Sequence, residues 1–139
     1  MSSDLTESEL EALRNVFEMA RTGDLARISE LVAADLPVNL TNAAGDTLLM
    51  LAAYHRHPDL VAALLEWGAD PSRVNDRGQT ALGAAVFRRS TASVEALLRA
   101  GADPSAGPRS ALEVAAVFEL PDMLALLTQA RPASGSAAG

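Results

Sequence analysis

The sequence predicts an all-α solenoid of about four helix–turn–helix repeats, mainly because it has a period of 33 residues. The segment 45–52 recurs as 78–85, so Thr47 and Thr80 lie 33 residues apart. The same spacing separates Val61 from Val94, Leu64 from Leu97 and Gly68 from Gly101. Within each period the apolar residues follow helical spacing. Stacked repeats of this kind build an extended surface and not a closed catalytic pocket.

The composition narrows the function classes. The chain has 139 residues, of which 49% are hydrophobic, and this is enough for one domain with a core. The net charge of −7 argues against general nucleic-acid binding. No apolar run approaches the ~20 residues of a membrane span, and the first residues lack the pattern of a secretory signal. The absence of cysteine excludes disulfides and suits the cytoplasm, and the use of arginine without lysine indicates a bacterial source.

Residues that typically begin and end helices predict the first two helices. Thr6 and Glu9 fit a capping box, with Leu5 and Leu10 at the positions of a hydrophobic staple. Gly23 ends this first helix. Asp24 can cap a second one, whose apolar positions are Leu25, Ile28, Leu31 and Val32.

The middle of the chain predicts two further pairs of short helices. Thr47 opens a helix to about His55, and Pro58 suits the first turn of the next, which Gly68 ends. That second helix is expected to bury Leu60, Val61, Leu64 and Leu65. A polar turn at 73–79 leads to helices at 80–88 and 91–100.

The last unit begins three residues early. Ser110 takes the place of Thr80 after 30 residues, and the missing residues lie in the turn around Gly107 and Pro108. Residues 120–124 then match 57–61. We expect a single domain over 1–130, with repeats at about 10–41, 42–74, 75–107 and 108–130, and a flexible tail at 131–139.

These residues resemble the ankyrin repeat, whose first helix opens with Thr-Pro-Leu-His-x-Ala. The matching positions are Gly45 and Thr47, Gly78 and Thr80, Leu49, Leu82 and Leu112, Ala52, Ala85 and Ala115, and both Gly-Ala-Asp segments. The resemblance covers roughly residues 14–130, with 10–41 and 108–130 similar to terminal capping repeats. The histidine of the family motif is absent throughout, and the glycine between the paired helices survives only as Gly23. Arg56, Arg89 and Glu119 replace it elsewhere, at a cost on the order of 1 kcal/mol if the site needs a positive φ.

The resemblance implies a protein-binding role for the turn tips and for the concave face of the first helices. Carried over by position, it gives these partner-binding candidates: Asp46, Asp76, Arg77, Gln79 and Arg109 at the tips, and Tyr54, His55, Phe87, Arg88 and Phe118 on the concave face. Aromatic residues beside arginine are typical of interface hot spots. The alternative for Phe87 and Phe118 is that they fold between the helix layers as core.

Arginines also gather between residues 71 and 109: Arg73, Arg77, Arg88, Arg89, Arg99 and Arg109. They face only Asp76, Glu95 and Asp103 in that stretch. They could steer an acidic patch of a partner. The other interpretation is that they pair with neighbouring carboxylates.

Metal and catalytic sites are not predicted. His55 and His57 are two residues apart, which does not converge on one helix face, so we expect His57 to be structural or to cap a helix. Trp67 is expected to pack over the loop beneath it, with an outer-face anchor as the alternative, and Met50 to fill the core. The sequence has no phosphate loop, nucleophile elbow or Ser-His-Asp set, so we expect neither an enzyme nor a cofactor.

The resulting hypothesis is a monomeric, non-enzymatic adaptor that binds another protein, one with an acidic patch if the arginines steer it. The alternative is an inhibitor or effector-like regulator that docks over a partner enzyme. The sequence does not name the partner, because recognition by such stacks lies in surface residues and not in a motif.

Overall fold

The computed structural model describes residues 6–129 and contains eight α-helices in that range. Their bounds are α1 Glu7–Thr22, α2 Leu25–Ala33, α3 Leu48–Tyr54, α4 Pro58–Glu66, α5 Ala81–Phe87, α6 Thr91–Arg99, α7 Ala111–Val117 and α8 Pro121–Gln129. The only β-structure in the described range is two isolated bridges. The predicted all-α solenoid is therefore confirmed.

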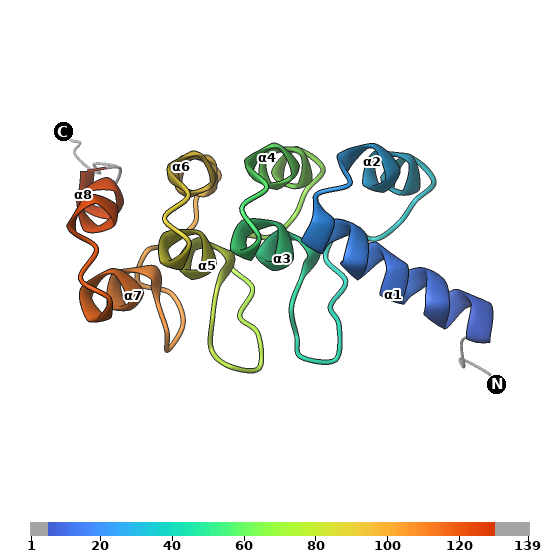
Figure 1. Ribbon diagram of the computed structural model, residues 1–139, viewed down its shortest axis with the longest axis horizontal. Helices are drawn as coiled ribbons and strands as arrows, with labels where there is room; N and C mark the ends of the chain where they lie inside the picture. Colours follow the sequence, from blue (N-terminus) through green and yellow to red (C-terminus); the bar gives the residue numbers. More distant parts are fainter. Residues whose placement is uncertain (1–5, 130–139) are drawn as a thin grey trace.

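The helices form two parallel rows, as Figure 1 shows. The first row holds α1, α3, α5 and α7, and the second row holds α2, α4, α6 and α8. Each helix packs against the next one in its own row and against the other helix of its pair. Every repeat is thus stabilised by its neighbours along the stack.

Three loops leave the second row and return to the first, and all three project to the same side of the stack (Figure 1). We call them the fingers: residues 34–47, 67–80 and 100–110. The third finger is shorter, as the early position of Ser110 predicts. The concave face is the surface lined by α3, α5, α7 and the fingers.

The first-row helices begin at the predicted caps. The hydroxyl oxygens of Thr47, Thr80 and Ser110 accept hydrogen bonds from the backbone N–H three residues later, at 3.1, 3.0 and 3.1 Å. The Thr6–Glu9 capping box of α1 is also present, with its two bonds at 2.9 and 3.1 Å. These bonds satisfy amides that no helical carbonyl can reach.

The turn between the two helices of a pair uses a left-handed residue in every case. Gly23 has φ 79°, and the three non-glycine replacements also have positive φ: 63° at Arg56, 56° at Arg89 and 54° at Glu119. A Cβ in this conformation crowds the following carbonyl oxygen, so each replacement stores about 1 kcal/mol of strain. At these three turns the backbone therefore keeps the left-handed conformation of Gly23 without a glycine.

The core runs continuously along the stack between the two rows. Ile28, Val61 and Val94 share one repeat position and are fully buried, as are Leu64 and Leu97. Met50 is also buried, as predicted. Leu65, predicted to be buried, is only partly so, and packs against this core together with Leu31 and Val32.

The first turns of α1 extend beyond the stack (Figure 1), and the predicted staple residue Leu10 is exposed there. The proposed staple residue Leu5 and the predicted tail at 131–139 lie outside the described residues.

Candidate partner-binding surface

Three aromatic side chains form a ladder across the concave face. Tyr54 ends α3, Phe87 ends α5 and Phe118 follows α7, so one repeat after another adds a ring at the same end of its helix. The Tyr54 and Phe87 rings are nearly parallel, with centroids 6.2 Å apart. Phe87 and Phe118 meet edge to face at 5.1 Å. We call these three residues the aromatic ladder.

The ladder is at the surface and not in the core. The exposed fractions are 42% for Tyr54, 42% for Phe87 and 54% for Phe118. The interpretation of the two phenylalanines as core residues is therefore wrong.

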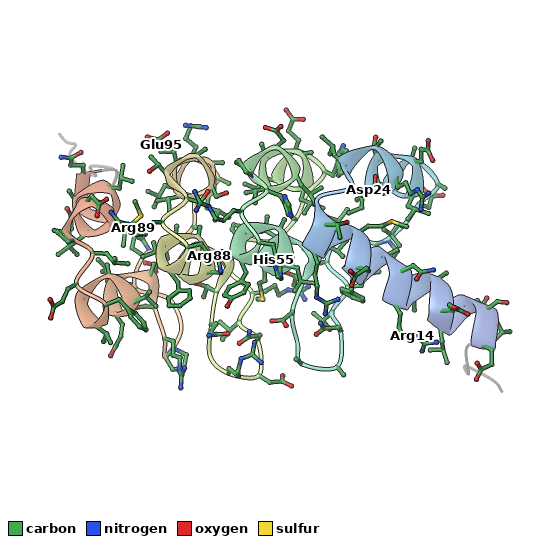
Figure 2. The ribbon with its side chains drawn as sticks, viewed as in Figure 1. Arg14, Asp24, His55, Arg88, Arg89 and Glu95 are labelled. Carbon is green, nitrogen blue, oxygen red and sulfur yellow. The ribbon has the colours of Figure 1, made fainter. Side chains whose placement is uncertain are left out.

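A cation and an imidazole flank Tyr54. The guanidinium carbon of Arg88 lies 5.2 Å from the centre of the Tyr54 ring, within range of a cation–π contact. The His55 ring meets Tyr54 edge-on at 5.1 Å. Figure 2 shows His55 and Arg88 at the ends of neighbouring first-row helices. Arg88 is in no ion pair within residues 6–129, so its charge is available to a partner.

The surroundings of His55 disfavour its protonation. Partial burial lowers the pKa of His55 below its ordinary value of 6.5, and the nearby side chains of Arg21, His57 and Arg88 lower it further. Glu18 opposes this effect but does not outweigh it. His55 is therefore mainly neutral at neutral pH, and the positive charge at this place comes from the arginines.

Two grooves lie on either side of Tyr54. The larger one, about 640 Å³, is lined by Tyr54, Gln79, Gly83, Ala84, Phe87, Pro108, Arg109, Glu113, Val114, Val117 and Phe118. The smaller one, about 410 Å³, is lined by Arg21, Asp46, Met50, Leu51, Tyr54, His55, Asn75, Arg77, Gln79, Thr80 and Ala84. We call them the α5–α7 groove and the α3–α5 groove. Tyr54, Gln79 and Ala84 belong to both, so the concave face is one continuous hollow surface.

Most of the predicted binding residues meet in these two grooves. The α5–α7 groove contains Gln79, Phe87, Arg109 and Phe118, and the α3–α5 groove contains Asp46, His55 and Arg77, with Tyr54 between them. Arg88 lies beside Tyr54 but outside both grooves, and Asp76 also lines neither.

The first two fingers are shaped by a pair of asparagines that the sequence argument missed. The side-chain oxygen of Asn42 accepts hydrogen bonds from the N–H groups of Ala44 and Asp46, both at 3.0 Å. Asn75 does the same for Arg77 and Gln79, both at 2.9 Å. Asn42 and Asn75 are 33 residues apart, so the repeat period could have identified them.

Neighbouring fingers are tied together even though the family's histidine is absent. The N–H of Asp76 donates to the carbonyl of Ala44 at 3.0 Å, and the N–H of Arg109 donates to the carbonyl of Gly78 at 3.0 Å. The Asn75 amide adds a bond of 2.7 Å to the Asp46 carboxylate. These bonds hold the finger tips in register.

The six clustered arginines fall into two groups. Arg73 pairs with Asp70 at 3.5 Å, Arg77 approaches Asp46 at 4.0 Å and Arg89 pairs with Asp122 at 2.9 Å. The remaining three, Arg88, Arg99 and Arg109, form no ion pair in the described part of the chain. The pairing interpretation therefore applies to the first three arginines, and a role of the other three in steering a partner stays a prediction.

Two residues with other candidate roles are structural. His57 occupies the N-cap position of α4 but its side chain makes no capping hydrogen bond, so of its two predicted roles the structural one applies. Its Nε2 instead donates to the carbonyl oxygen of Arg21 at 2.7 Å, which ties the α3–α4 turn to the end of α1. A Cβ at Gly23 would lie 2.5 Å from the His57 ring, so this contact also requires that glycine. Trp67 is partly buried and packs against the core, which favours the packing interpretation.

Sequence reasoning also missed three groove residues. Gly83 and Glu113 share a repeat position with Met50, three residues after the capping Thr80, Ser110 and Thr47 respectively. Arg21 enters the α3–α5 groove from α1. The period could have identified the first two, whereas Arg21 belongs to the irregular first repeat.

The described residues offer no obvious metal site or membrane span. Within residues 6–129 no three His, Cys, Asp or Glu side chains are grouped so that they could hold a metal ion. None of the helices in this range is long and apolar enough to cross a membrane.

Comparison with known proteins gives the family. Residues 16–108, more than half of the chain, match the family model described as ankyrin repeats (3 copies). The chain belongs to the ankyrin-repeat family. It is also 47% identical over 51 residues to a Pseudomonas aeruginosa protein whose name assigns it ankyrin repeats. That match covers 37% of this chain and 30% of the relative. Ankyrin repeats generally mediate protein–protein interaction, and the family is a non-enzymatic interaction fold.

Proposed function

We propose that this ankyrin-repeat protein is a non-enzymatic adaptor that binds one partner protein through its concave face and finger tips. The observation that supports this most is the exposed aromatic ladder of Tyr54, Phe87 and Phe118. Large aromatic side chains that share one exposed surface mark interaction sites. Aromatic residues and arginine together are the residue types that dominate binding energy at interfaces.

The surface around the ladder supports the same proposal. The fingers carry polar groups, among them Asp46, Asp76, Arg77 and Gln79, at the rim of a more apolar centre. An apolar centre with a polar rim is the usual arrangement of protein interfaces. Arg88 and Arg109, which form no ion pair within residues 6–129, favour an acidic patch on the partner, because opposite charges accelerate association.

The proposal includes a monomeric chain that acts in a bacterial cytoplasm, with the repeats at about 10–41, 42–74, 75–107 and 108–130 as its units. The second candidate function is an inhibitor that docks over the active site of a partner enzyme. It rests on the same surface, because a continuous hollow face can cover a site as well as join two proteins.

One experiment separates the two functions. The tagged chain is used to isolate a stoichiometric partner, and the activity of that partner is measured with and without the chain. An adaptor leaves the intrinsic activity unchanged and links the partner to a further protein, whereas an inhibitor lowers the activity at one-to-one stoichiometry. If no partner is retained at micromolar concentrations, the proposed function is wrong.

A further inference from the structure

The α5–α7 groove borders a position at which one repeat lacks a side chain. The position three residues into each first-row helix is Met50 in α3, Gly83 in α5 and Glu113 in α7. Met50 is buried and lines the α3–α5 groove of about 410 Å³. Gly83 is one of the residues that line the α5–α7 groove, which measures about 640 Å³, and its own Cβ position lies close to the carbonyl oxygen of Arg109. The second volume lies well within the range of sites that hold a ligand group.

The walls of this groove are mainly apolar. Ala84, Val114 and Val117 line it together with the edge-to-face pair Phe87 and Phe118. Burial of a large apolar side chain against such a wall is favourable, because it removes apolar surface from water, by about 25 cal/mol for each Å² buried. A small or charged side chain would gain much less.

The charges at the groove decide which residues can accompany a large apolar side chain that binds there. Arg109 enters from the third finger, and Arg88 lies over Tyr54 at the other side of the ladder. Neither arginine is in an ion pair within the described residues, and Glu113 is the only acidic side chain in the lining. The groove and its edge therefore carry two positive charges against one negative charge, in a chain with a net charge of −7.

We propose that the α5–α7 groove binds an acidic linear segment of another protein, with one large apolar side chain seated over Gly83 and a neighbouring carboxylate paired with Arg109. This deepens the proposed adaptor function and rests on it, because it names the chemistry that the concave face recognises. The space over Gly83 decides which segments fit, and the two arginines orient the segment along the ladder.

Two matched substitutions test the apolar part. Gly83→Met fills the groove with the side chain that the preceding repeat already carries at this position. Gly83→Ala is its control, because both variants place the same Cβ about 3.3 Å from the carbonyl oxygen of Arg109. A Cβ at that distance presses on the backbone of Arg109, so a thermal melt checks that both variants remain folded, and Gly83→Ala measures the effect of that contact alone. Only the methionine occupies the volume of the groove.

The probes are three fluorescent peptides measured by anisotropy: a leucine flanked by aspartates, the same leucine flanked by lysines, and an alanine flanked by aspartates. The wild type should bind the first at least ~10-fold more tightly than either of the others, which is about 1.4 kcal/mol. Gly83→Met and Arg109→Glu should each reduce that binding at least ~10-fold, and Gly83→Ala should leave it within ~3-fold.

Other outcomes overturn the inference. Equal binding of the aspartate and lysine peptides would contradict the charge selection, and equal binding of leucine and alanine would contradict the apolar seat. No binding of any peptide would show that a linear segment is not the occupant. Self-association of the chain that Gly83→Met abolishes would identify a second copy as the occupant.

The adaptor function is judged separately. If an isolated partner loses affinity for Tyr54→Ala and Arg88→Glu but not for Gly83→Met, the proposed function stands and this inference is wrong.

Discussion

At the scale of single residues, the chain keeps the ankyrin geometry while it violates the residue preferences of the family. Arg56, Arg89 and Glu119 adopt the left-handed conformation in which glycine is normally found. Arg89 gains an ion pair of 2.9 Å with Asp122 from its position, although an exposed pair of this kind contributes little stability. Arg56 has no hydrogen bond or ion pair from its side chain within residues 6–129, so its strain is not offset locally.

Arg56→Gly should stabilise the protein for this reason. At φ 63° a glycine removes the Cβ strain, so the free energy of unfolding should rise by about 0.5–1 kcal/mol relative to Arg56→Ala. The comparison with alanine removes any effect of the guanidinium. Urea unfolding of the two variants measures the difference, and a glycine variant less stable than the alanine variant would contradict the observed backbone conformation.

His55 predicts a dependence of stability on pH. Its pKa is lowered in the folded state, so the unfolded chain takes up the proton first when the pH falls. The contribution of His55 is therefore complete above the ordinary value of 6.5 and is lost as the pH falls below it, towards the lowered pKa. Unfolding free energies between about pH 7.5 and pH 5.5 should fall less steeply in His55→Gln than in the wild type. Identical slopes would show that His55 is not responsible.

Asn75 is expected to contribute as much to the free energy of unfolding as a core residue does. Its oxygen satisfies two N–H groups of the second finger, and its amide bonds to Asp46 and Gln79 at 2.7 and 3.0 Å. Asn75→Ala leaves these groups unpaired at a nearly buried site and should cost about 1–3 kcal/mol. Asn75→Asp keeps the accepting oxygen but sets a second carboxylate against that of Asp46, so it should lose at least as much. Thermal unfolding measures both losses, and an Asn75→Ala variant as stable as the wild type would show that these bonds do not matter.

At the scale of helices and loops, the parts of the fold that depend on local chemistry could be predicted from the sequence. Thr47, Thr80 and Ser110 cap their helices within three residues of chain, so their role needs no tertiary information. The repeat period also gave the positions of Tyr54 and Phe87 on equivalent helices. It could not decide whether Phe87 is buried, because that depends on how far the short α5 extends past its neighbours.

Contacts between repeats were the part that the sequence did not reveal. Arg89 and Asp122 pair between neighbouring repeats, and the α5–α7 groove has walls that α7 supplies. These features need the distance between stacked helices, and no local pattern in one repeat contains it. The partner of His57 could not be predicted for the same reason, because it is the carbonyl of Arg21 in the preceding repeat.

The packing of the second-row helices predicts where truncation is costly. Leu64 and Leu97 are fully buried between the rows, so Leu64→Ala or Leu97→Ala should cost about 2–5 kcal/mol. Leu124→Ala in α8 is the matched control. Leu124 corresponds to Val61 in the repeat, yet it is 39% exposed where Val61 is 0% exposed. Urea unfolding should show a small effect for Leu124→Ala, and a loss as large as that of Leu64→Ala would contradict the assigned core.

At the scale of the whole molecule, the stack separates stability from recognition. The core lies between the two rows, while the aromatic ladder and the grooves lie on the concave face. Substitutions on the concave face should therefore change binding with little effect on folding. The described residues also show why the last repeat differs: Leu124 is exposed because no further described helix packs against α8.

The most direct test of this account compares the two faces of the stack in one binding assay with the isolated partner. Tyr54→Ala and Arg88→Glu change the concave face, and Glu66→Arg and Glu95→Arg change exposed positions on the second row; Figure 2 marks Arg88 and Glu95. The concave variants should each weaken binding at least ~30-fold, about 2 kcal/mol, while the second-row variants leave it unchanged and all four melt close to the wild type. Loss of binding in the second-row variants, with the concave variants unaffected, would place the partner on the opposite face and contradict the account.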